Sequence, residues 1–533
     1  MISIKEKIEE WAKKTLGEGQ FNLVHPKEIK NGDFTLIVAT EYANEFGEVL
    51  SKNLIPEVEK VEVACRFVNL FLSKEFFVES VNEINEKATD FGKTNLLEDQ
   101  KIMVEYTDPN PFKEFHIGHL MPNVIGESLS RLFEASNAEV KRVNYQGDVG
   151  MHVAKAVWGK LQKPESSWGD AYVYGSQNYD DNKTEVEKIN KKIYEKSDQK
   201  INNLYEEGKK QSLDYFEMVY KKLGTKFDHY FFESEVGGFG KEIVLEFLKK
   251  GVFEKSDGAV VFHGEKYDPK LHTRVFINSQ GLPVYEAKEL GLSKIKYNAY
   301  PYDLSVVVTG NEINEYFKVL LAAMGQIFPE LAQKTKHISH GMLRLPTGKM
   351  SSRTGNIITA DSLIEQVKEK IKEKIDDNSI AEIIAIGAIK YSILRQAIGG
   401  DIIFDFDKSI SFEGDSGPYL QYTAVRAKSV LEKAKNYTTL KVSKVPFDTP
   451  IEVERLLYRF PEIGERASRE CAPHHIVTYL IELASSFNSF YANNKIIDES
   501  DPASPYKLAL TQAVAHALTN GLQLLGIKVP EKM

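Results

Sequence analysis

Apolar and polar positions alternate along this chain in a pattern that predicts a strand, a tight loop and a helix near residue 110. Residues 101–104 form a short apolar run typical of a buried strand, and residues 120–134 carry apolar side chains at helical spacing. The intervening loop, residues 105–119, contains two prolines that restrict its backbone. The pattern therefore predicts a loop that delivers its last residues to a helix N-terminus.

The chain before this loop, residues 1–95, predicts a separate small α/β unit. A helix is expected up to about Leu16, followed by strands at 34–38, 61–64 and 66–72 with a helix between them. Beyond the loop, strands are expected at 139–144 and 302–309, with a β-element at 258–262 and 274–277. A highly charged segment, about 160–240, interrupts the pattern, and we expect it to form a pair of inserted helices that are solvated on most faces.

The last third of the chain reads as helical throughout. Residues 357–410 predict a helical stem, and helices are expected at 419–433, 451–468, 476–493 and 507–525. This succession predicts an all-α bundle over residues 411–533.

Length and composition favour a protein of three or four units in a reducing compartment. A single core is implausible for 533 residues. The two cysteines, Cys65 and Cys471, lie far apart and provide no disulfide framework. The amphipathic N-terminus argues against a secretory signal, and the longest apolar run is too short and too interrupted to span a bilayer. We therefore expect a soluble, cytoplasmic protein with no membrane partner.

The net charge of −9 argues against non-specific attraction of the whole molecule to nucleic acid. Phosphates respond to local basic patches within a Debye length of about 8–10 Å, so RNA binding stays possible through shape and particular side chains.

The end of the loop, His116-Ile-Gly-His119, is the first candidate for chemistry. A helix N-terminus offers free backbone N–H groups and the positive end of the helix dipole, which favour phosphate. Two imidazoles can also donate hydrogen bonds to phosphate oxygens, and Gly118 leaves room for a ligand. Taken alone, this motif is more often a turn with two surface histidines than a phosphate site. A zinc pair lacks a third ligand at metal spacing.

A second candidate lies far downstream, in residues 340–356. Gly348 and Gly355 bracket a polar loop with two cations, Lys349 and Arg353. This loop is either an exposed basic turn or a lid that closes on the β- and γ-phosphates of a nucleotide.

Together the two stretches resemble the paired motifs of the class I aminoacyl-tRNA synthetases, and their surroundings resemble the arginyl family in particular. The resemblance covers nearly the whole chain. It implies a Rossmann-like, doubly wound parallel sheet over 97–356, a stem over 357–410, an anticodon-binding bundle over 411–533 and an N-terminal domain that touches the tRNA elbow. The residues that support it are Asn110, Lys113, Asn144–Gly150, Tyr285–Glu289, Gly417–Tyr422 and Leu524–Met533.

The resemblance also implies ATP-dependent activation of L-arginine followed by transfer to tRNA(Arg), with Mg²⁺ brought by the nucleotide and no dedicated metal site in the protein. Catalysis would fall to Lys113, His116, His119, Lys349 and Arg353. ATP would contact Gly118, Gly147, Asp148, His340, Gly341, Met342, Ser351 and Ser352.

Arginine recognition would fall to a group of acidic and polar side chains that suits a planar cation with five donors. Its members by resemblance are Glu105, Asp108, Asn110, His116, Tyr285, Glu289 and Glu312. Several departures from the family pattern concern charge: Ser352 replaces a lysine that Lys113 compensates, and Glu289 stands where an aspartate is usual. Asp108 replaces a small residue and Glu312 replaces a glutamine, so each is a ligand for a cationic substrate or a solvated carboxylate.

The bundle supplies candidates for anticodon contacts, because aromatic faces stack on splayed bases and arginine meets phosphate. They are Tyr419, Gln421, Tyr422, Arg426, Tyr491 and Met533, and packing within the bundle explains each tyrosine equally well. The family is mostly monomeric. Three other functions stay open: a class I synthetase for another amino acid, an ATP-dependent ligase that never touches RNA, and a non-catalytic tRNA-binding relic.

Overall fold

The structure, a computed structural model, describes residues 3–17, 21–344, 358–434, 441–447 and 449–533. Its elements form two compact units, and each unit draws on several stretches of chain. The first comprises residues 1–92, 422–463 and 479–521, and the second comprises residues 93–421, 464–478 and 522–533. In the described part of the chain, no helix combines the length and the apolar character that crossing a bilayer requires.

The N-terminal part of the first unit is an antiparallel sheet with helices, as the sequence predicted. The strands run in the order β1-β2-β4-β3. They are β1 (Asn22–Val24), β2 (Phe34–Ile37), β3 (Val58–Ala64) and β4 (Phe67–Leu72). The helices are α1 (Ile4–Leu16), α2 (Ala43–Lys52) and α3 (Lys74–Lys87), with the 3₁₀ turns η1 (Ile29–Asn31), η2 (Thr40–Tyr42) and η3 (Ala88–Asp90).

The C-terminal part of the chain is helical, with one difference from the prediction. Its helices are α16 (Gly417–Lys433), α17 (Glu452–Leu457), α18 (Phe460–Glu470), α19 (His474–Asn493) and α20 (Ser504–Leu524). The single helix predicted over 451–468 is wrong, because the chain forms α17 and then α18. Pro461 is the second residue of α18 and has no N–H to donate to the carbonyl of Leu457, so the helix ends and a new one begins.

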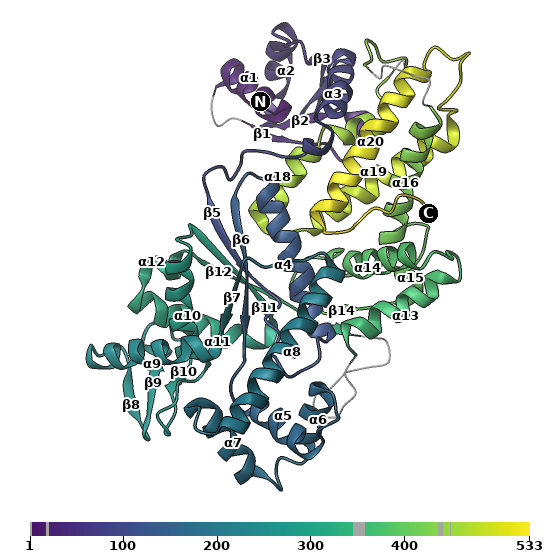
Figure 1. The fold of residues 1–533 in the computed structure, drawn as a ribbon. Helices are drawn as coiled ribbons and strands as arrows, with labels where there is room; N and C mark the ends of the chain where they lie inside the picture. Colours follow the sequence, from purple (N-terminus) through teal and green to yellow (C-terminus); the bar gives the residue numbers. More distant parts are fainter. Residues whose placement is uncertain (1–2, 18–20, 345–357, 435–440, 448) are drawn as a thin grey trace. The chain divides into compact units, whose positions relative to one another are not determined.

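The second unit is organised around a parallel sheet of five strands in the order β12-β11-β5-β6-β7 (Figure 1). These are β5 (Lys101–Glu105), β6 (Glu139–Gln146), β7 (His229–Phe232), β11 (Leu304–Gly310) and β12 (Thr335–His340). The chain moves outward from β5 through β6 to β7 and later returns to the other side of β5 as β11 and β12. The order therefore reverses between β5 and β11, and ligands of such sheets bind outside the carboxyl ends of the strands at this point.

Helix α4 (Ile117–Ala135) contacts β5, β6 and β11. Helix α10 (Tyr285–Ala299) packs against α9 (Glu233–Lys249), and a core formed by Met103, Val143, Phe231, Leu292 and Tyr302 joins it to the sheet. The other helices of this unit are α5 (Met151–Gln162), α6 (Trp168–Gln177), α7 (Lys183–Glu195), α8 (Gln199–Leu223), α11 (Asn314–Ile327), α12 (Pro329–Gln333), α13 (Ala360–Lys372), α14 (Asn378–Leu394) and α15 (Phe406–Ser409).

Short elements complete the unit and confirm the β-element predicted near residue 260. Strands β8 (Glu254–Ser256), β9 (Ala259–His263) and β10 (Thr273–Ile277) form an antiparallel sheet. Strand β13 (Leu343–Arg344) pairs with β14 (Ile402–Ile403), and η4 (Gly264–Lys266) and η5 (Asn311–Ile313) are 3₁₀ turns.

The charged segment 160–240 differs from its prediction in two respects. It contains β7, which pairs with β6 and completes the central sheet. It also contains parts of five helices rather than two. One of them, α8, buries Ser212, Phe216, Val219 and Tyr220, so it belongs to the core of the unit rather than to a solvated insertion. Strand β7 has only four residues, three partly buried and one buried, so it gives no clear alternation, which is why the sequence pattern hid it.

Candidate active site

The two histidines of the loop cap helix α4, and their hydrogen bonds fix which ring nitrogen carries the hydrogen. His116 is the N-cap, and its Nδ1 accepts from the backbone N–H of Gly118 at 3.0 Å. The Nδ1 of His119 accepts from the N–H of His116 at 3.4 Å. Because Nδ1 is the acceptor in both rings, each neutral imidazole carries its hydrogen on Nε2 and presents a donor. The ring centroids are 3.8 Å apart.

Burial keeps both imidazoles neutral at physiological pH. It lowers the pKa of His116 to about 4, and the nearby Lys113 cation contributes to this shift. Burial also lowers the pKa of His119 well below its usual value, and His116 and Lys113 add to the effect. Lys113 itself lies over the ring of Tyr172, 4.8 Å from its centroid. The site therefore offers two N–H donors beside a lysine cation.

The expectation that free backbone N–H groups of this helix bind phosphate is wrong. The N–H of Ile117 donates to Ile358 O at 3.2 Å, and that of Gly118 donates to the His116 ring. The N–H groups of His119 and Leu120 both donate to His116 O. Anion binding at this end of α4 is left to the side chains and to the helix dipole. The local packing also requires glycine at position 118, because a Cβ there would lie 2.7 Å from His116 Cε1.

A cavity of about 510 Å³ opens beside these histidines, at the carboxyl ends of β5, β11 and β12. This is the point where the strand order reverses. Nine of the predicted site residues line it together: Asp108, Asn110, His116, Gly118, His119, Glu312, His340, Gly341 and Met342. Thr107, Thr309 and Arg344 are further polar lining residues that the sequence did not indicate. Segments more than two hundred residues apart thus meet around one opening.

His340 contributes a buried polar atom to this site. Its Nδ1 pairs with Gly341 O at 2.6 Å, so Nδ1 carries the hydrogen and Nε2 is an acceptor. Nε2 is buried and has no hydrogen-bond partner among the described residues. Burial lowers the pKa of this imidazole.

A buried acidic group adjoins the cavity at the end of β5. The carboxylate of Glu105 accepts from Lys296 Nζ of α10 at 2.6 Å, and the backbone N–H of Tyr145 donates to Asp108 Oδ1 at 2.7 Å. Burial, reinforced by Glu105, raises the pKa of Asp108 well above its usual value. Burial and Glu105 also raise the pKa of Glu289 to about 8, against the opposing effect of Lys296. In the described part of the chain, neither Asp108 nor Glu289 forms a salt bridge.

Lys296 was missed from the sequence, although a signal for it exists. It follows Glu289 by seven residues, two turns along α10, and so lies on the same face of the helix. Tyr285 is the first residue of α10 and is 60% exposed, and Glu312 lies exposed in η5. Tyr285 and Glu289, four residues apart, share a helix face as well.

Gly147 and Asp148 form a buried corner rather than part of the cavity lining. Asp148 is fully buried, and its Oδ2 accepts from Lys209 Nζ at 2.7 Å and from Tyr205 OH at 3.0 Å, both on α8. Ser234 donates to Asp148 through both its backbone N–H and its hydroxyl. A Cβ at Gly147 would lie 2.3 Å from Asn110 Oδ1, so the glycine allows Asn110 to approach.

The second predicted motif lies largely outside the described residues. Lys349, Ser351, Ser352 and Arg353 belong to residues 345–357, which the structure does not describe. Both flanks of this stretch are described and lie at the cavity. Arg344 lines the cavity, and Thr359 forms a β-bridge with His116.

Three of the predicted RNA contacts gather in the first unit. The Arg426 guanidinium lies 4.6 Å from the ring centroid of Tyr422 and 5.4 Å from that of Tyr491, and it donates to Asn488 Oδ1 at 2.6 Å. Tyr491 is 38% exposed.

The other three predicted RNA contacts belong to the second unit. Tyr419 and Met533 are partly exposed there. Gln421 is fully buried, and its amide donates to Lys528 O at 2.7 Å. The Gln421 side chain is therefore used inside the protein and is not available to a base in this conformation. Among the described residues, no group of three or more His, Cys, Asp or Glu side chains is arranged to hold a metal ion.

Comparison with known proteins assigns this architecture. A family model described as tRNA synthetases class I (R), catalytic domain, matches residues 81–406, and a model described as DALR anticodon binding domain matches residues 420–533. The chain is 30% identical over 590 residues to an arginine--tRNA ligase of Borrelia turicatae (strain 91E135), covering 100% of both chains. It is 31% identical over 577 residues to that of Porphyromonas gingivalis (strain ATCC 33277), covering 97% of this chain and 96% of the relative.

Solved structures show the same fold. Arginyl-tRNA synthetase of Thermus thermophilus superposes with a TM-score of 0.81 at 22% identity, covering 99% of this chain and 100% of the other. That of Plasmodium falciparum gives 0.78 at 19% identity, covering 100% of both.

The catalytic-domain match spans well over half of the chain, and a sheet of this topology with two histidines capping the helix after its first strand is the architecture of a nucleotide-using synthetase. The protein is thus a class I aminoacyl-tRNA synthetase, a class whose catalytic domain uses ATP. Within that class, the chain belongs to the arginine--tRNA ligase family.

Proposed function

We propose that this protein attaches L-arginine to tRNA(Arg) in two steps, arginyl-adenylate formation and transfer to the 3′-terminal adenosine. The observation that carries the proposal is the juxtaposition of two opposite environments at one opening. A cavity lined by two imidazole N–H donors adjoins a buried group of carboxylates, which suits a substrate set that contains both a triphosphate and a side-chain cation.

In the first step, an α-carboxylate oxygen of arginine attacks the α-phosphorus of ATP, and the bond from that phosphorus to the bridging oxygen of the β-phosphate breaks. Pyrophosphate leaves with the electron pair of that bond. Such a displacement needs alignment and charge stabilisation more than covalent help. Because His116 and His119 are neutral and carry hydrogen on Nε2, they donate to the phosphate oxygens without a change of protonation.

Lys113 adds positive charge at the same end of α4, and we assign the leaving pyrophosphate to Lys349 and Arg353. The flanks of residues 345–357 support this assignment, because they lie beside His116 and at the cavity. The adenosine end is assigned to Gly118, His340, Gly341 and Met342. Gly147 contributes by leaving room for Asn110 to approach, and Asp148 beside it is held by Tyr205, Lys209 and Ser234.

The acidic group selects the amino acid by charge. Lys296 already neutralises Glu105, so Asp108 and Glu289 are the carboxylates left to pair with a guanidinium. Tyr285 and Glu312 complete the proposed set from α10 and η5, and Asn110 orients the α-amino and carboxylate groups. A neutral side chain could not pair with these carboxylates once they ionise, so it would gain none of the charge-assisted hydrogen bonds that a guanidinium makes.

We further propose that Mg²⁺ enters with the ATP phosphates, that the helices after residue 411 read the anticodon stem and loop, and that residues 1–95 touch the tRNA elbow. The cluster of Arg426 with Tyr422 and Tyr491 supports the second assignment, because it combines a cation with exposed ring surface. A monomer in the cytoplasm fits these roles.

Pyrophosphate exchange into ATP, measured with each of the twenty amino acids in the presence of total tRNA, tests the proposal. Arginine alone should support exchange. Exchange with another amino acid instead would overturn the assignment of substrate, and charging of tRNA that persists after removal of residues 411–533 would overturn the role of the bundle.

A further inference from the structure

Two cations, the partly exposed Arg131 and the buried Lys390, hold the carboxyl ends of two helices against the catalytic helix α4. Arg131 of α4 donates to Gln523 O at 3.1 Å and to Gly224 O at 3.2 Å. Lys390 of α14 donates to Gly526 O and to Leu223 O, both at 2.6 Å. Each cation therefore reaches the last carbonyls of α8 and the chain that leaves α20. Terminal helix carbonyls have no partner within the helix and carry partial negative charge, so cations suit them.

Two further side chains hold the C-terminal segment, residues 522–528, by hydrogen bonds. Ser128 Oγ of α4 donates to Leu524 O at 3.0 Å, and Gln421 Nε2 donates to Lys528 O at 2.7 Å. Four main-chain carbonyls between residues 523 and 528 are thus held by side chains of three different helices. The chain makes a tight turn there, with Gly526 at φ +66°, and a Cβ at this position would lie 3.1 Å from Lys390 Nζ.

Burying the Lys390 ammonium group costs desolvation free energy, which a side chain that served stability alone would not need to pay. It is 1% exposed, and its two recorded acceptors are carbonyls rather than a carboxylate. Burial lowers the pKa of Lys390 to about 7, and the Arg131 cation adds to this shift. An apolar side chain avoids that desolvation, whereas a buried polar group with fixed acceptors selects one geometry among many.

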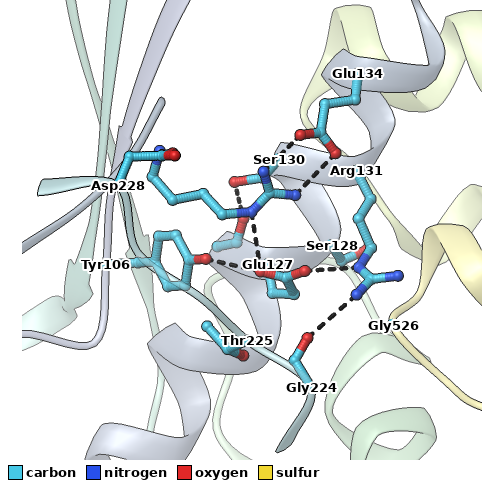
Figure 2. Close-up of polar contacts among 12 residues, drawn as sticks. Tyr106, Glu127, Ser128, Ser130, Arg131, Glu134, Gly224, Thr225, Asp228 and Gly526 are labelled. Carbon is cyan, nitrogen blue, oxygen red and sulfur yellow. Dashed lines mark hydrogen bonds and ion pairs between the residues drawn. The ribbon is translucent and has the colours of Figure 1, made fainter. Parts of the chain in front are cut away.

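From Arg131 the contacts continue to the cavity. Arg131 Nε donates to Glu127 Oε1 at 2.7 Å, and Tyr106 OH donates to Glu127 Oε2 at 2.8 Å (Figure 2). Arg142 Nε of β6 also donates to Glu127 Oε2, at 3.1 Å. Tyr106 directly precedes Thr107 and Asp108, which line the cavity.

A second series of hydrogen bonds leads from the end of α8 to the cavity. Thr225, which follows Gly224, donates from its hydroxyl to Asn123 Oδ1 at 3.0 Å. Asn123 of α4 in turn donates to Thr107 Oγ1, also at 3.0 Å. Thr107 holds a left-handed backbone at φ +80°. Both routes therefore end on the same strained turn at the cavity.

We propose that Arg131 and Lys390 are positioning residues for amino-acid activation. By seating the C-terminal segment, residues 522–528, and the end of α8 against α4, they fix the turn at Thr107–Asp108 and the histidines at the other end of α4. Arg131 lies fifteen residues from His116, which is about 22 Å along a helix, so the effect passes through position and not through contact. The inference rests on the proposed function for its activity assay.

The variants Arg131→Met and Lys390→Met remove the cations. Gly526→Ala disturbs the packing of the C-terminal segment against Lys390 without removing a polar group. Lys507→Met is a matched control, because Lys507 is also a buried lysine and caps the carbonyl of Lys495 outside this network. Arginine-dependent pyrophosphate exchange is measured at saturating tRNA, with KM for each substrate, thermal unfolding, and hydrogen exchange of residues 104–124.

All three variants should lower kcat by about 10- to 100-fold, the effect of a small misplacement of reacting groups, with KM for tRNA within about two-fold of the wild type. Hydrogen exchange in 104–124 should become faster. Arg131→Lys should recover part of kcat, and Lys507→Met should keep it.

A lower melting temperature with unchanged kcat would overturn the proposal and leave a purely stabilising role. A raised KM for tRNA with unchanged kcat would also overturn it, because the segment would then serve tRNA binding. A wild-type protein inactive with arginine would refute the proposed function instead, and the hydrogen-exchange comparison would still decide whether the seating orders the turn.

Discussion

Arginine binding should tighten as the pH rises from 6 to 8, because the proposed pocket must lose a proton to accept a guanidinium. Glu289 is partly buried on α10, and burial together with Glu105 raises its pKa to about 8. The same two causes raise the pKa of Asp108. A bound guanidinium pairs with the ionised carboxylates and drives the proton off.

The size of the effect follows from the pKa. At pH 7, one pH unit below a pKa of about 8, roughly one molecule in ten has Glu289 ionised. Ionising the rest costs about 1.4 kcal/mol, so Kd for arginine should be about ten-fold weaker at pH 7 than its limiting value and about ten-fold weaker again at pH 6. The contribution of Glu289 to proton release on binding at pH 7 should be about 0.9 proton. Above pH 8 the curve should flatten.

Isothermal titration calorimetry of arginine into the protein measures both quantities. Titrations at pH 7 in phosphate and in Tris, whose ionisation enthalpies differ, give the number of protons released, and titrations from pH 6 to 8 give the slope of Kd. Glu289→Gln should remove most of the slope. Glu286→Gln, which neutralises a neighbouring carboxyl on α10 that faces Arg274, should keep it.

A Kd that stays constant within about two-fold from pH 6 to 8, with no proton release, would refute the reasoning. Glu289 would then be ionised before arginine arrives, and the proposed division of charge between Glu105, Lys296 and the two free carboxylates would be wrong.

Three further predictions concern other parts of the molecule. His116→Ala should lower the rate of pyrophosphate exchange by about 10²–10³-fold, as loss of a preorganised donor does, while filter binding of tRNA stays unchanged. Arg426→Ala should raise KM for tRNA in aminoacylation by about ten-fold with kcat unchanged, because its guanidinium organises the aromatic cluster of the first unit; an equal loss in kcat would contradict this. Arg455→Met leaves the fully buried Asp33 without its cation and should reduce the free energy of unfolding in urea by about 3–5 kcal/mol, without changing kcat per folded molecule.

The sequence was sufficient wherever the signal was local. The buried strand at 101–104 and the helix after the loop, with His116 near its N-terminus, follow from apolar spacing and neighbouring residues, and the structure confirms each of them. The motifs also predicted that His116, His119 and His340 share a site, and the cavity brings them together. The DALR match likewise confirms the helical C-terminal domain.

Predictions failed where long-range partners decide what a residue does. Strand β7 is four residues long and becomes recognisable only through its pairing with β6. The N–H groups of the first turn of α4 looked free in the sequence, but Ile358, more than two hundred residues away, takes one of them. Gln421 was predicted to contact RNA, yet its side-chain amide donates a hydrogen bond to the carbonyl oxygen of Lys528.

The sequence by itself therefore determined the individual helices and strands and the kinds of side chain present at the site, because both depend on residues close together in the chain. Only the tertiary structure decided which carboxylates stay unpaired beside Lys296 and which helix ends Arg131 and Lys390 hold. Charge neutralisation and the capping of helix ends are satisfied by whatever folding brings within about 3 Å, and that distance cannot be read from separation along a chain.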